Sequence, residues 1–111
     1  MDYSQHKRFD EDFFNMRTDN DSELVEKVLS STIKTLEKFL NEIDNNTADI
    51  DSIAHHLKGT AMVVGLYRLG YICSDIMKND DEETVSELVD FAKNEMILLV
   101  DFLGEKLKSL S

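Results

Sequence analysis

Apolar residues recur at three- and four-residue steps along most of the chain, which is the spacing of one helical face. The longest series cover residues 24–43, 53–64, 66–77 and 85–107, and a shorter one covers 9–16. No segment shows the strict alternation of apolar and polar residues that is typical of a β-strand. The pattern therefore predicts an all-α protein, an up-down four-helix bundle with a short extra N-terminal helix.

Polar runs indicate where these helices end. Residues 18–22 and 44–47 are polar and predict loops, and Asp49 or Asp51 can cap the helix that follows the second loop. Gly65 predicts a kink or the end of that helix.

The domain organisation follows from the same pattern. Residues 1–8 are polar and predict a flexible N-terminal tail, and residues 9–111 predict one helical domain.

Composition excludes several classes of protein. The 111 residues include 23 acidic and 12 basic side chains, no proline and one cysteine, and the formal net charge is −11. This charge argues against a general nucleic-acid binder, which needs a basic face. One cysteine cannot form an internal disulfide, and no apolar run reaches the roughly 18 residues of a membrane span. We therefore expect no membrane partner and a cytoplasmic location, or a nuclear one in a eukaryote.

The charge is unevenly distributed. Residues 53–78 contain Lys58, Arg68 and Lys78 against Asp75 alone, although the chain as a whole is strongly acidic. Three of the four glycines and two of the three histidines lie in the same stretch, so functional residues are best sought there.

His55 is the main candidate for chemistry. At 100° per residue it points away from the apolar face of its helix, with Lys58, Gly59 and Met62 around it. An imidazole is a nucleophile near neutral pH, and a nearby lysine can offset the charge of a phosphoryl group. Glycine in a helix costs about 1 kcal/mol relative to alanine, which suggests that the space beside His55 is useful. An exposed histidine is, however, more often only a solvated surface residue.

The residues around His55 also resemble a known family. Residues 55–61 read His-His-Leu-Lys-Gly-Thr-Ala, and Gly65 and Leu66 follow. This pattern is similar to the histidine-containing phosphotransfer (HPt) domain of free-standing phosphorelay carriers, and the likeness spans residues 9–108. The resemblance implies that His55 accepts a phosphoryl group from a receiver-domain aspartate and passes it to another receiver aspartate, in two-component signalling.

The resemblance also implies roles for the neighbouring residues. Lys58 matches the position that assists the phosphoryl group, Gly59 the position that leaves room for it, and Gly65 the position that lets the next helix pack. A polar side chain of the preceding helix often bonds near the acceptor, and Ser31 is the best match. We expect apolar residues around His55 to dock the partner; the candidates are Met62, Leu66, Phe13, Leu24 and Val28.

The expected partners are response-regulator receiver domains and hybrid sensor kinases, and the protein itself is expected to be a monomer. The family pattern places Mg²⁺ on the receiver, so the chain needs no cofactor of its own. No phosphate-binding glycine loop is present, which predicts a phosphocarrier without a kinase domain rather than an enzyme.

Two alternatives stay open. A helical adaptor module would bind receivers or kinases without phosphotransfer, and a hydrolytic or metal-dependent enzyme would use the abundant carboxylates. The adjacent residues His55 and His56 diverge on a helix, so the sequence predicts no metal site.

Overall fold

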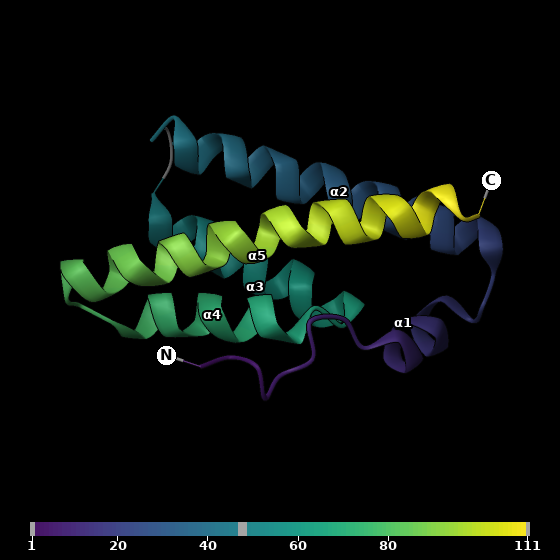
Figure 1. Cartoon of the computed structure of the whole chain (residues 1–111), viewed down its shortest axis with the longest axis horizontal. Coiled ribbons are helices and arrows are strands. Elements are labelled where there is room, and N and C mark those ends of the chain that lie inside the picture. Colours follow the sequence, from purple (N-terminus) through teal and green to yellow (C-terminus); the bar gives the residue numbers. More distant parts are fainter. Residues whose placement is uncertain (1, 47–48, 111) are drawn as a thin grey trace.

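The computed structural model describes residues 2–46 and 49–110, and within them all regular structure is helical (Figure 1). The prediction of an all-α protein is confirmed. Five helices follow one another in the described part of the chain: α1 (Glu11–Thr18), α2 (Ser22–Asp44), α3 (Ile50–Val64), α4 (Tyr67–Lys78) and α5 (Glu82–Lys108).

Aspartate side chains cap the N-termini of four of the helices. Asp10, Asp21, Asp49 and Asp81 each accept a hydrogen bond from a backbone N–H in the first turn of α1, α2, α3 and α5. Such caps satisfy donors that have no partner within the helix. Their positions explain why each polar run in the sequence ends where a helix begins.

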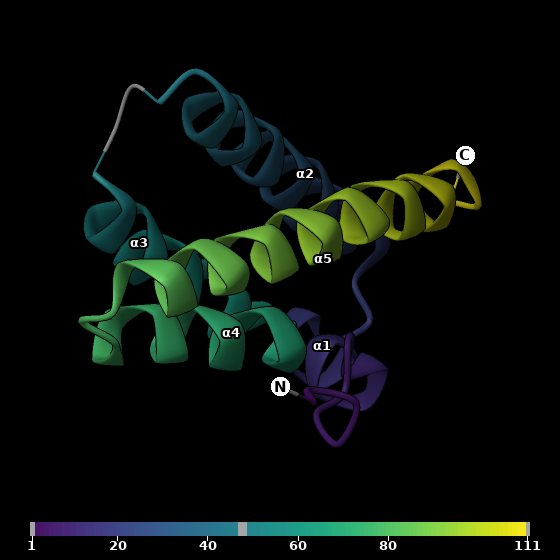
Figure 2. The same ribbon diagram turned by 60° about the vertical axis from the view of Figure 1, so that its left-hand side comes forward.

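The four longer helices pack in a ring. α3 lies mainly against α4, α4 also against α5, and α5 against α2, whereas α3 and α5 make no close backbone approach within the described chain (Figure 2). α3 and α5 therefore lie diagonally across the core. The core is formed by fully buried side chains from all five helices, the largest being Phe14, Leu29, Leu36, Leu57, Leu66, Leu69, Ile72, Leu88, Met96, Leu99 and Leu103.

The N-terminal segment 2–10 packs along α4 and α5. The Tyr3 hydroxyl donates to Asp75 at 2.6 Å, and burial together with this bond raises the pKa of Tyr3. The ring of His6 stacks on Tyr71 with 3.8 Å between centroids, and Arg8 pairs with the buried Glu95 at 2.8 Å. These contacts differ from the expectation of a loose tail over residues 1–8, because three polar side chains of the segment have partners on the bundle.

Gly65 ends α3 in a left-handed conformation with φ of 86°. The N–H of Leu66 donates to the carbonyl of Ala61 at 2.8 Å, and the carbonyl of Gly65 accepts from Asp10 at 2.8 Å. A Cβ at position 65 would lie 3.0 Å from the Asp10 carbonyl oxygen. Glycine is required here both for the backbone angle and for the close approach of the segment that leads into α1.

We therefore expect Gly65→Ala to lower the free energy of unfolding by about 2 kcal/mol, because it adds left-handed strain and crowds Asp10. Urea denaturation followed by circular dichroism measures this change. Gly59→Ala, which adds a methyl group inside α3 where no atom lies within 4 Å, is the matched control and should not destabilise the fold. Equal stability of Gly65→Ala and the native protein would contradict this prediction.

Candidate functional site

His55 lies on the exposed side of α3. Within the described chain, its ring has one contact, an edge-on approach to the His56 ring with 6.3 Å between centroids. The His56 ring in turn lies 6.1 Å from the ring of Phe39 on α2. His56 therefore leans towards α2, while His55 stays open to solvent and no described protein group hydrogen-bonds to its ring nitrogens.

Gly59 follows His55 by one helical turn, and an added Cβ there would meet no atom within 4 Å. The helix surface at Gly59, one turn after His55, is therefore open; whether that space serves the phosphoryl group stays a prediction.

Lys58 is half-buried on α3, and its positive charge is close enough to act on the thiol of Cys73 in α4. Burial raises the pKa of Cys73 to about 12, and the Lys58 charge opposes that rise only in part. The site therefore combines an exposed imidazole, an open space and one cation on the same helix.

Met62 has a second role that the sequence analysis missed. Its side chain is half-buried and lies over Gly70 of α4, where an added Cβ would be 2.5 Å from the Met62 sulfur. Gly70 thus provides the space into which Met62 packs, so Met62 joins α3 to α4 as well as bordering the His55 side.

The expectation that Leu66 contacts a partner is wrong. Leu66 has no exposed surface and packs among core residues that include Phe14, Leu29 and Leu103. Gly65 ends α3 in a left-handed conformation, so Leu66 does not continue the exposed face of α3 and is turned into the core.

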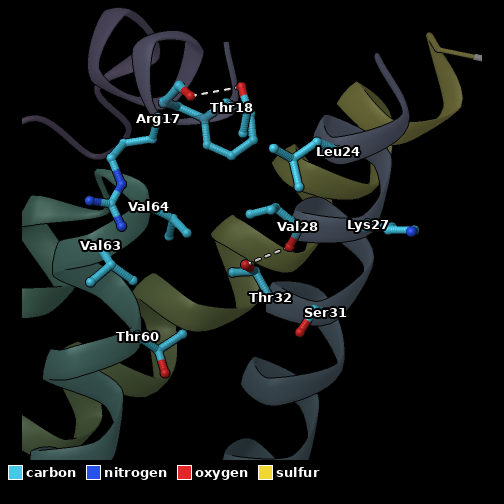
Figure 3. Close-up of a pocket in the computed structure, with 11 residues that line it drawn as sticks. Arg17, Thr18, Leu24, Lys27, Val28, Ser31, Thr32, Thr60, Val63 and Val64 are labelled. Atoms are coloured by element: carbon cyan, nitrogen blue, oxygen red, sulfur yellow. Dashed lines mark hydrogen bonds between the residues drawn. The ribbon is translucent and has the colours of Figure 1, made fainter. Parts of the chain in front are cut away.

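A groove of about 500 Å³ opens between α1, the first half of α2 and the second half of α3 (Figure 3). Leu24 and Val28 of α2 line it, as does Ser31, and Arg17 and Lys27 add two cations. Thr60 begins the α3 wall five residues after His55, which is about 7 Å along the helix axis. Thr60 also lies about 140° around the helix from His55, so the groove opens at the side of α3 that faces α2 and not on the face that carries His55.

The structure places two predicted residues differently from the expectation. Phe13 packs on the ring of Tyr67 at 5.8 Å between centroids, and it is the next residue, Phe14, that lines the groove. Ser31 is exposed, and no hydrogen bond links it to His55 in the described part of the chain.

Sequence reasoning missed Val63, which is 49% exposed and lines the groove. Val63 follows His55 by eight residues, which is about 80° around the helix. The helical geometry that placed His55 outwards could therefore have placed Val63 on the same side of α3.

The model of the Hpt domain family matches residues 23–104, which run from the start of α2 almost to the end of α5. The chain belongs to the Hpt domain family. No curated protein and no solved structure matches it.

Hpt domains act in histidine phosphotransfer within phosphorelay signalling, where they interact with receiver domains and kinases. They are phosphocarriers and not kinases. The Hpt match does not include α1 or the N-terminal segment 2–10. These two parts of the chain therefore lie outside the region that the family model describes.

The described residues also bear on metal binding and on membrane insertion. In residues 2–46 and 49–110, no three His, Cys, Asp or Glu side chains are grouped so that they could hold a metal ion. No helix in this part of the Hpt protein is both long enough and apolar enough to cross a membrane.

We expect Lys58→Ala to slow phosphotransfer about fivefold with the fold unchanged, because a nearby charge on a solvated surface contributes about 1 kcal/mol. The rate of phosphate uptake from a phosphorylated receiver, measured over seconds to minutes, tests this. Lys34→Ala, an exposed lysine of α2, is the control with the same change in net charge. If both variants slow transfer equally, the effect belongs to overall charge and not to Lys58.

Proposed function

We propose that this protein accepts a phosphoryl group on His55 from an aspartyl phosphate of one receiver domain and passes it to the aspartate of another. The single observation that carries the proposal is the position of His55. It is an exposed imidazole that makes no hydrogen bond to the residues that the structure describes, one turn from an open space, on a helix within the Hpt match.

In this reaction the chain supplies the nucleophile and its immediate surroundings, and the receivers supply the rest. A ring nitrogen of His55 attacks the phosphorus of the acyl phosphate, and the bond between phosphorus and the aspartate oxygen breaks as the new bond forms. The carboxylate stays on the first receiver, and the same exchange runs in reverse on the second. We assign the Mg²⁺ for these steps to the receivers. The Lys58 charge favours the phosphorylated state, and the open space at Gly59 admits the receiver's reactive group.

The groove between α1, α2 and α3 suits the docking of a receiver. Leu24 and Val63 expose apolar surface, and Arg17 places positive charge near it, whereas Lys27 is paired with Glu23 at 3.9 Å. An acidic receiver site would be attracted to this region. Donor and acceptor receivers use the same face of α3, so they bind in turn and not together.

We further infer that α2 to α5 form the up-down bundle of the family, since they pack in a ring and coincide with the Hpt match. A rigid bundle holds His55 in place while receivers exchange. We keep the expectations that the protein is a monomer and is cytoplasmic, or nuclear in a eukaryote, as parts of this proposal.

The direct test is to mix the protein with a receiver domain phosphorylated by acetyl phosphate and then freed of that reagent. If the phosphoryl group is transferred, the receiver loses phosphate and this protein gains phosphate that is acid-labile and base-stable. Adding a second receiver should remove that phosphate again. Stable binding of receivers without any gain of phosphate would instead favour the adaptor function.

A further inference from the structure

The outer face of α5 exposes an unusual amount of apolar surface for a small acidic protein. Ile97 is 55% exposed, Leu98 50% and Phe102 48%. Leu98 and Phe102 are one helical turn apart and line a shallow groove of about 340 Å³. α5 makes no close backbone approach to α3, the helix of His55, in the described chain, because the two helices are diagonal in the ring.

Acidic side chains surround these apolar residues. Asp101 and Glu105 line the groove itself, and at 100° per residue Glu87 and Asp90 continue the same face towards the start of α5. All four are exposed.

The lysines of α5 do little to neutralise this face. Lys93 and Lys106 turn to its edges, where Lys93 pairs with Asp44 at 2.7 Å and Lys106 pairs with Glu11. Lys108 lies at the end of the helix, 3.5 Å from Glu105. The centre of the face is therefore apolar and negatively charged.

The chain's own N-terminal segment shows which chemistry this helix binds. Tyr3 approaches the Phe91 ring at 6.0 Å between centroids, Arg8 pairs with Glu95, and Phe9 approaches Phe102 at 5.7 Å. Aromatic and arginine side chains in alternation thus occupy one edge of the α5 face. Arg8 also forms one wall of the groove that stays open beside them.

We propose that the outer face of α5, defined by Ile97, Leu98, Asp101, Phe102 and Glu105, docks a basic amphipathic segment of a partner protein. Its apolar side chains pack on Leu98 and Phe102, and its lysines or arginines lie against the two carboxylates. A second copy of this chain is a poor occupant, because two acidic faces of a protein with net charge −11 would repel each other. None of the residues that line this site belongs to α3, so a partner can hold the protein while receivers exchange phosphate on His55.

The probe is a synthetic helical peptide with leucines at i, i+3, i+4 and i+7 and lysines elsewhere. It is titrated into the ¹⁵N-labelled, unphosphorylated protein, and amide shifts and the Kd are measured. We expect the shifts to concentrate in residues 94–108. Leu98→Ser should raise the Kd about tenfold, and Asp101→Asn with Glu105→Gln should raise it about fivefold.

Matched variants on the other side of the molecule control for unspecific attraction. Val63→Ser removes a similarly exposed apolar side chain from α3, and Glu23→Gln with Glu26→Gln makes the same change in net charge on α2. The proposal would be overturned if these control variants raised the Kd as much as the α5 variants do. It would also be overturned if the amide shifts were centred on α2 and α3. The proposal would also be overturned if sedimentation showed the wild-type protein to be a dimer and the Leu98→Ser variant to be a monomer. The occupant of the face would then be a second copy of this chain. Binding uses unphosphorylated protein, so its outcome does not depend on phosphotransfer at His55.

Discussion

His55→Gln is expected to abolish phosphate uptake from a phosphorylated receiver while leaving the bundle folded. Glutamine is polar and helix-compatible, and position 55 is exposed without a hydrogen-bond partner in the described structure, so the substitution removes no packing. It does remove the ring nitrogen to which the phosphoryl group would bond. Acid-labile phosphate on the variant should fall to background, and the circular dichroism spectrum and melting temperature should match those of the native protein.

The neighbouring histidine is the natural control. His56 is also exposed and on α3, but its ring leans towards Phe39 of α2. We expect His56→Gln to keep at least about half of the native transfer rate, a difference well under 1 kcal/mol. Transfer that survives His55→Gln and is lost with His56→Gln would move the acceptor to the second histidine.

The helices and their starts were predictable because they depend on local chemistry. Apolar spacing of three and four residues identifies a helix wherever it packs, and Asp49 at the end of a polar run caps α3 as expected. The outward direction of His55 followed from the same helical geometry. These features require no knowledge of which helices become neighbours.

Features that depend on tertiary contacts were predicted less well. Leu66 was misplaced although a helix end at Gly65 was expected, because the direction of the chain after a left-handed residue depends on tertiary packing. The contacts of Tyr3 with Asp75 and of Arg8 with Glu95 join residues more than 70 positions apart, and no local pattern in a polar segment indicates such partners. The packing of Met62 on Gly70 likewise depends on how closely α3 approaches α4.

Gly59→Gln is expected to reduce phosphotransfer at least tenfold without lowering stability, which separates access to His55 from folding. A Cβ at position 59 meets nothing within 4 Å, so the fold tolerates a side chain there, and replacing a helical glycine should add up to about 1 kcal/mol of stability. The longer glutamine side chain would occupy the space beside the imidazole that the receiver's aspartyl phosphate must enter. The measurements are the initial rate of phosphate uptake and the urea midpoint.

Gly104 provides the matched control for this experiment. It is also a glycine within a helix, α5, and an added Cβ there likewise meets no atom within 4 Å. Gly104→Gln should therefore raise stability by a similar amount and leave transfer unchanged, because α5 lies diagonally opposite α3. If both variants slow transfer to the same degree, loss of helix flexibility would explain the effect. If Gly59→Gln transfers at the native rate, the space beside His55 is not used by the receiver, and the glycine needs another explanation.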